Sequence, residues 1–254
     1  MRQWRGEANG NTFLILWSDQ PSDLDARLFL DKRIRKRNLW NFDSALVLTP
    51  TETDASVAMT ILERDGTVST MCGNGARVVG ELLRRSGLRP IIETHRTTIS
   101  LERSTGGFWV PIDIVEIPTR FENGLHVPAH FPLFRLYSVL GEPHAVTIVR
   151  NVWEAPLAVW GTFFSSNRIN CTVVHRDGGS ILYARTFERG VGAETRSCGT
   201  GACAAAWLIC KGGLVRKKTV EVKMHEHMLT VFIDEGQGIF LKGSAPVSCQ
   251  PTEL

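Results

Sequence analysis

The chain has 254 residues, of which 43% are hydrophobic and 22% charged, a composition that excludes disordered, fibrous and membrane-embedded proteins. Its net charge of +3, from 29 basic and 26 acidic residues, is too small to indicate a nucleic-acid partner. The apolar run at residues 13–17 is too short for a secretory signal or a membrane-spanning helix. We therefore expect a cytoplasmic protein without a membrane partner, built as one large domain or two modest ones.

Strands dominate the first part of the chain. Apolar runs bounded by turn residues predict strands, and Asp65-Gly66 is typical of a tight hairpin. A helix is expected at residues 23–37, with Ser22 or Asp23 as its N-cap and a basic run at its solvated end. The expected strands of this part are residues 12–17, 44–48 and 56–62.

A cysteine in a glycine-rich turn follows these strands. Residues 75–86 place apolar side chains at helical spacing, so CGNG, which begins at Cys72, forms the turn that opens a helix. The second half repeats this plan, because strands expected at residues 169–174 and 181–187 precede CGTG, which begins at Cys198. The alanine-rich helix after CGTG is expected to end at two glycines, Gly212 and Gly213.

The two cysteine motifs indicate an internal duplication. CGNGARVVG and CGTGACAAA are offset by 198 − 72 = 126 residues, about half the chain, which is too long for a solenoid repeat. We therefore predict an α/β protein of two similar halves that face each other across a cleft. The boundary is placed loosely near residue 115, giving halves 1–115 and 116–254, with the alternative that the C-terminal segment returns to the first half.

Each CGxG turn is expected to bind an anion and to activate its cysteine. The first turn of a helix has N–H groups without acceptors and lies at the positive end of the helix dipole. A phosphate would fit one such turn, but two turns that each begin with cysteine point to a more specific chemistry. Helix N-termini lower thiol pKa values from about 8.5 to between about 3.5 and 7.5, so a thiolate at neutral pH is expected. We interpret Cys72 and Cys198 as an acid–base pair.

Two opposed thiols can invert the α-carbon of an amino acid. One thiolate removes the α-proton while the opposite thiol delivers a proton to the other face, and the roles exchange in the reverse reaction. Backbone N–H groups at the two helix starts would bind the substrate carboxylate and stabilise the charge that develops on it. The chain has no dinucleotide motif, no Walker motif and no evident Schiff-base lysine, so we predict an isomerase without a cofactor. The N–H donors are those of Gly73, Asn74, Gly199 and Thr200.

The other four cysteines are expected to pack as free thiols rather than to react. The spacing of Cys203 and Cys210 relative to Cys198 lacks the CxxC pairs of structural zinc sites, so no metal is expected. His225 and His227 alternate along an expected strand and are assigned to the surface. The cysteines assigned to packing are Cys171, Cys203, Cys210 and Cys249.

The sequences CGNGAR and ERGVGAETRSCGTGACAA resemble the two signatures of the diaminopimelate epimerase family. The resemblance runs through the chain, since ANGNTF, NFDSAL and GEPHAV are similar to the family's GLGNDF, GFDQLL and GNPHCV. It implies an α/β (α+β) fold of two pseudo-symmetric halves, each a β-barrel-like sheet around a central helix, with the substrate at their interface. It also implies that Cys72 and Cys198 are the catalytic cysteines.

The resemblance also assigns residues to substrate binding. Three positions depart from the family, because Ser44 replaces a glutamine while Glu63 and Glu142 replace asparagines that hold the distal end of diaminopimelate. The segment GVGAET contains one extra residue. The polar positions that match the family are Asn11, Asn170, Glu188 and Arg189.

The two glutamates change the expected substrate. Two unit charges about 4 Å apart interact by about 4 kcal/mol at an effective dielectric constant near 20, so Glu63 and Glu142 would repel a distal carboxylate. We therefore expect a basic amino acid, such as lysine, ornithine, arginine or histidine, or a related compound. Arg189 favours a distal carboxylate instead, unless one of the two glutamates neutralises it, and the glutamates have the alternative of pointing to solvent.

Other functions remain as alternatives. Diaminopimelate epimerase itself is the first, and an isomerase of unsaturated acids on the same fold is the second. A non-catalytic amino-acid- or anion-binding protein is a third, and a redox sensor that joins its cysteines in a disulfide is a fourth. The partner expected is the small-molecule substrate, and the chain is expected to act as a monomer or a homodimer.

Overall fold

The computed structural model describes residues 2–18, 42–51, 56–63, 67–69, 71–95, 98–105, 107–118, 126–214, 218–234 and 238–247, together with the backbone of residues 252–253. The expected helix at residues 23–37, the Asp65-Gly66 turn and Cys249 lie outside these ranges. None of the described helices is long and apolar enough to cross a membrane.

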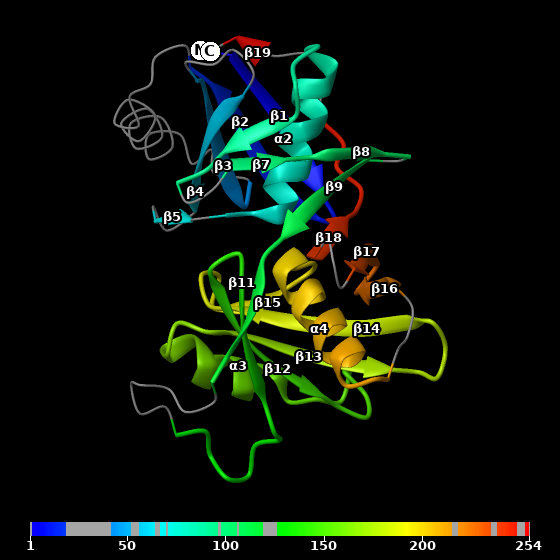
Figure 1. Cartoon of the computed structure of the whole chain (residues 1–254). Helices are drawn as coiled ribbons and strands as arrows, with labels where there is room; N and C mark the ends of the chain where they lie inside the picture. Colours follow the sequence, from blue (N-terminus) through cyan, green and yellow to red (C-terminus); the bar gives the residue numbers. More distant parts are fainter. Residues whose placement is uncertain are drawn as a thin grey trace. The chain divides into compact units, whose positions relative to one another are not determined.

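The chain forms two compact units, each of which combines β-strands with α-helix, and this confirms the mixed α/β class (Figure 1). The first unit comprises Met1–Val110 and Gly243–Leu254, and the second comprises Pro111–Lys242. A boundary at residue 115 would cut strand β10 (Ile114–Ile117), which pairs with β11 of the second unit. The C-terminal segment joins the first unit, where the Glu7 N–H donates to the Pro246 carbonyl at 2.9 Å.

The first unit is built on a sheet with the strand order β19-β1-β2-β3-β4-β6-β7, in which β5 also pairs with β4. Helix α2 (Gly73–Arg85) packs on β1, β2 and β6 with an apolar face that is buried. Strands β8 and β9 form an antiparallel pair. The strands are β1 (Arg2–Ala8), β2 (Asn11–Trp17), β3 (Ser44–Pro50), β4 (Val57–Glu63), β5 (Val68–Ser69), β6 (Ile91–Glu93), β7 (Thr98–Ser100), β8 (Glu102–Ser104), β9 (Gly107–Ile112) and β19 (Thr252–Glu253).

The second unit is built on a sheet with the strand order β10-β11-β12-β13-β14-β16-β17-β18, in which β15 also pairs with β14. Helix α4 (Gly199–Lys211) contacts strands along most of this sheet, whereas α3 (Leu157–Ser166) contacts β13, β14 and β15. The remaining strands are β11 (Arg135–Val139), β12 (Glu142–Ile148), β13 (Asn170–Arg176), β14 (Ile181–Glu188), β15 (Ala193–Thr195), β16 (Thr219–Met224), β17 (His227–Asp234) and β18 (Gly238–Lys242).

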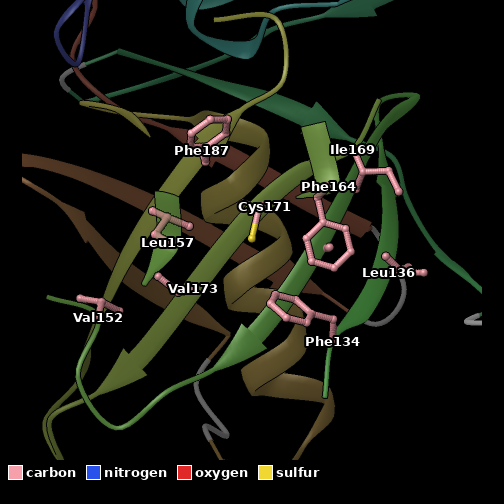
Figure 2. Close-up of a cluster of buried hydrophobic side chains, with 10 residues drawn as sticks. Phe134, Leu136, Val152, Leu157, Phe164, Ile169, Cys171, Val173 and Phe187 are labelled. Carbon is pink, nitrogen blue, oxygen red and sulfur yellow. The ribbon is translucent and has the colours of Figure 1, made fainter. Parts of the chain in front are cut away.

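A hydrophobic cluster that includes aromatic rings packs helix α3 onto the sheet of the second unit (Figure 2). The rings of Phe134 and Phe164 meet edge to face, with centroids 4.7 Å apart. Figure 2 shows the Cys171 sulfur inside this cluster, and burial raises the pKa of the Cys171 thiol far above its usual range. Cys171 and Cys203 are fully buried, which confirms that they pack, and Cys210 is partly buried.

The two units repeat one connectivity. The series β1-β2-β3-β4, β5, α2, β6, β7 has the same order as β11-β12-β13-β14, β15, α4, β16, β17 (Figure 1). The pairings also match, since β2–β3 and β12–β13 are parallel, and so are β4–β6 and β14–β16. The expected strands and both CGxG helices are confirmed to within two residues at each end. The duplication therefore extends from the two motifs to the strand order of each unit.

Candidate active site

Cys72 and Cys198 occupy the same position, the N-cap, of helices α2 and α4. Both have extended backbones, with φ −140° and ψ 107° at Cys72 and φ −130° and ψ 109° at Cys198. Each Sγ accepts a hydrogen bond from the N–H three residues later, at 3.3 Å from Gly75 and 3.4 Å from Gly201. A thiol thus takes the capping role that serine or aspartate usually has. Within the described ranges, four first-turn N–H groups have no protein acceptor: those of Gly73, Asn74, Gly199 and Thr200.

The surroundings of Cys198 favour its protonated form. Its side chain is only 5% exposed, and this burial raises the pKa of the Cys198 thiol well above its usual range. The charge of Glu188 and a hydrogen bond between the thiol and the Glu188 carboxylate raise this pKa further. These surroundings favour the thiol form of Cys198, because desolvation outweighs the donors at the helix N-terminus. The expected pair of one thiolate and one thiol stays a prediction.

The polar residues predicted in the first unit lie at neighbouring strand ends. Asn11 begins β2, Ser44 begins β3 and Glu63 ends β4, and the pairing of these strands brings the three ends to one edge of the sheet. Ser44 Oγ donates to Glu63 Oε2 at 2.9 Å, and Ser69 Oγ donates to Glu63 Oε1 at 2.6 Å. Both oxygens of the Glu63 carboxylate are therefore held by hydroxyl groups. Sequence reasoning missed Ser69, although it lies three residues before Cys72.

Arg77 of the CGNGAR motif stabilises the start of α2 through buried hydrogen bonds. Its side chain is fully buried and donates to the Asn74 side-chain oxygen, to Asn9 Oδ1 at 2.9 Å and to the Ser244 carbonyl at 3.3 Å. These contacts tie the first turn of the helix to the turn before Asn11 and to the C-terminal segment. The arginine of the motif was the available signal for this role.

The second unit places its predicted residues at the equivalent edge. Arg189 Nη2 donates to Glu142 Oε2 at 2.6 Å, and the Arg189 N–H donates to Asn170 Oδ1 at 3.0 Å. The Arg189 and Glu142 side chains are 34% and 17% exposed, so the ion pair is partly buried. Of the two glutamates that the sequence left open, Glu142 is the one that pairs with Arg189.

A chain of buried polar groups leads from the core of the second unit to Cys198. His144 Nδ1 lies 3.3 Å from Thr172 Oγ1, and His144 Nε2 lies 2.9 Å from Thr200 Oγ1. Thr200 Oγ1 in turn lies 3.4 Å from Cys198 Sγ. Burial and, to a smaller extent, the charge of Arg189 lower the pKa of His144 to about 3, so the imidazole is neutral at physiological pH. Sequence reasoning missed His144, whose signal was the sequence GEPH.

The buried threonine hydroxyls leave no room for a side chain at Gly201, so its replacement by alanine is expected to destabilise the protein. A Cβ at residue 201 would lie 2.4 Å from Thr186 Oγ1 and 3.1 Å from Thr172 Oγ1. Overpacking of this kind costs about 1–3 kcal/mol, although alanine is otherwise favoured over glycine in a helix. Urea denaturation of Gly201→Ala measures the loss, and Gly190→Ala, whose Cβ would meet no atom within 4 Å, is the control. Equal stability of the two variants would contradict this prediction.

The expectation that His225 and His227 alternate along one strand is wrong. His225 lies in the turn after β16 with a φ of 52°, whereas His227 begins β17, so the two do not share a strand. His225 Nε2 lies 2.8 Å from Glu194 Oε1, which holds it against β15. Across the described part of the chain, no group of three or more His, Cys, Asp or Glu side chains is arranged to hold a metal ion.

Comparison with known proteins places the chain among epimerases. It is 35% identical over 264 residues to a diaminopimelate epimerase from Methanothrix thermoacetophila, covering 95% of this chain and 92% of that protein. It is 30% identical over 260 residues to a diaminopimelate epimerase from Psychrobacter cryohalolentis, covering 92% and 87%. No protein-family model matches the chain.

Solved structures share the fold at low sequence identity. A predicted epimerase from Pseudomonas aeruginosa superposes with a TM-score of 0.68 at 15% identity, covering 100% of this chain and 98% of that one. A methylitaconate-delta-isomerase gives a TM-score of 0.59 at 12% identity, covering 99% and 94%. The fold and the relatives together define an isomerase of the epimerase type. The chain belongs to the diaminopimelate epimerase family.

Proposed function

We propose that this protein is a cofactor-independent racemase or epimerase that inverts the α-carbon of an amino acid by proton transfer between Cys72 and Cys198. The observation that carries this proposal is the matched pair of thiol N-caps, one on α2 and one on α4. Each cap is followed by two N–H groups that can donate hydrogen bonds to the oxygens of a substrate carboxylate. These donors stabilise the charge that builds on the carboxylate when the α-proton leaves.

In this proposal one cysteine is a thiol and the other is a thiolate before the reaction. Cys198 is the acid in this proposal, since burial and then the neighbouring Glu188 raise the pKa of its thiol. Cys72, whose side chain is less buried, is the base in this proposal. The Cys72 thiolate takes the α-proton, and the Cys198 thiol gives its proton to the opposite face of the same carbon. The reverse reaction begins from the state with the proton on Cys72.

The substrate we propose is a basic amino acid. Arg189 would be the natural partner of a distal carboxylate, but Glu142 already neutralises it. Glu63 adds a carboxylate where the family has a neutral amide, which disfavours a second negative charge on the substrate. Diaminopimelate is the alternative substrate, supported by the names of the relatives and by the retained Asn11, Asn170, Glu188 and Arg189.

The proposal is tested by following α-proton exchange in D₂O by NMR. L-lysine, L-ornithine, L-arginine, L-histidine and LL-diaminopimelate are offered separately, and we expect deuterium at the α-carbon of at least one basic amino acid. Exchange on diaminopimelate alone would contradict the basic substrate and support the alternative. An unsaturated tricarboxylic acid is offered as well, since double-bond migration without α-exchange on any amino acid would favour allylic isomerisation instead.

A further inference from the structure

Glu63 occupies in the first unit the position that Glu188 occupies in the second. Ser44, at the start of β3, pairs with Glu63 at the end of β4. The register of β13 and β14 likewise places Asn170, at the start of β13, beside Glu188 at the end of β14. The strand order on both sides of these pairs is the same in the two units. The two glutamates are therefore equivalent under the internal duplication.

The short strands β5 and β15 lead to the same equivalence independently (Figure 1). Ser69 pairs with the residue two before Glu63, and Thr195 pairs with the residue two before Glu188. Residues two apart on a strand share a face, so each hydroxyl lies on the same face as its glutamate. Ser69 is three residues before Cys72, and Thr195 is three residues before Cys198.

The hydrogen bonds repeat as well. Ser69 Oγ donates to Glu63 Oε1 at 2.6 Å, and Thr195 Oγ1 donates to Glu188 Oε1 at 2.5 Å. Held in this way, Glu188 accepts a hydrogen bond from the Cys198 thiol that follows it on the next helix. In the first unit, Ser44 adds a second donor to the Glu63 carboxylate at 2.9 Å. The two donors orient both oxygens of the Glu63 carboxylate.

We infer that Glu63 is the acid–base partner of Cys72, as Glu188 is the partner of Cys198. This inference rests on the proposed two-thiol reaction. An asparagine, which the family has at this position, cannot accept a proton from a thiol, so the role belongs to this chain and not to the resemblance.

The glutamate resets the first thiol. After Cys72 has taken the α-proton, its S–H bond breaks, an O–H bond forms on the Glu63 carboxylate, and the electron pair stays on sulfur as the thiolate. The proton then leaves Glu63 to water. Cys72 can thus return to the thiolate without waiting for a substrate of the opposite configuration.

The test measures Cys72 without a substrate. The rate of Cys72 alkylation by iodoacetamide is followed against pH by mass spectrometry. The two proteins compared are the Cys198→Ala variant and the same variant with Glu63→Gln added. A carboxylate beside a thiol disfavours the thiolate, so its neutralisation lowers the pKa of Cys72. We expect the midpoint of the alkylation profile to fall by about one pH unit or more, with about tenfold faster alkylation below that midpoint.

Glu93→Gln is the matched control. Glu93 lies in the same unit on β6, near the far end of β4, and also accepts a serine hydrogen bond, from Ser56 at 2.5 Å. The inference is overturned if Glu63→Gln leaves the midpoint in place, or if Glu93→Gln moves it equally. Glu63→Asn removes the same charge and replaces Glu63→Gln in the comparison if the latter does not fold.

Activity separates this inference from the proposed function. With a substrate found by α-proton exchange, Glu63→Gln is expected to lower kcat by at least about tenfold, whereas Glu93→Gln keeps it. A shifted alkylation midpoint in a protein that exchanges no amino acid would retain the Glu63–Cys72 pair and overturn the proposed function. An unshifted midpoint in an enzyme that exchanges an amino acid would overturn the Glu63–Cys72 pair and retain the proposed function.

Discussion

Replacing either Cys72 or Cys198 by alanine is expected to abolish the interconversion of enantiomers but to leave α-proton exchange on one of them. In the proposed reaction each thiol acts on one side of the α-carbon, so the remaining thiol can remove a proton and return a deuteron to the same side. Inversion needs the second thiol, and the loss of a general acid or base costs about 10²–10⁴-fold in rate. Cys72→Ala and Cys198→Ala should therefore exchange opposite enantiomers.

The measurement uses both pure enantiomers of the substrate in D₂O, with NMR for deuterium and chiral chromatography for configuration. Cys210→Ala is the control, since Cys210 lies on α4 but at the end away from the N-cap, and it should retain full activity. Thermal denaturation shows whether loss of the buried Cys198 side chain unfolds the second unit. Exchange on the same enantiomer in both variants would rule out one thiol on each face.

Replacing Glu142 by asparagine is expected to shift substrate preference from a basic amino acid toward diaminopimelate. The structure has Glu142 as the partner of Arg189, at 2.6 Å, so the guanidinium is neutralised. Asparagine releases Arg189 to bind a distal carboxylate and removes a negative charge that would repel it. We expect the ratio of kcat/KM values to change by about tenfold to a hundredfold, less than full charge interaction would give because the pair is partly exposed.

The ratio of kcat/KM values is measured by competition, with a basic amino acid and LL-diaminopimelate present in one reaction. Glu116→Asn is the matched control, because it breaks the exposed Glu116–Arg135 pair of the same unit, whose side chains are 57% and 52% exposed. An unchanged ratio in Glu142→Asn would mean that the ion pair does not contact the distal end of the substrate. A ratio that moved further toward the basic amino acid would contradict the charge argument.

Most of the candidate site was readable from sequence because its residues lie in local motifs. Cys72 and Cys198 precede glycines at helix starts, and the helix N-terminus that makes them caps depends on a few neighbouring residues. Ser69 and Thr195 were missed although they lie close by, since their partners are reached through strand pairing rather than along the chain. His144 was missed for the same reason, because its contacts come from β13 and α4.

The sequence by itself determined the α/β class, the duplication, the two cysteine-capped helices and the family, since each follows from spacing within a short segment. The tertiary structure decided which glutamate pairs with Arg189 and which one is held by two serine hydroxyls. It also decided that the pKa of the Cys198 thiol is raised, because burial and the Glu188 charge oppose the helix N-terminus. These outcomes depend on desolvation and on distances between strands, and both quantities exist only after the chain has folded.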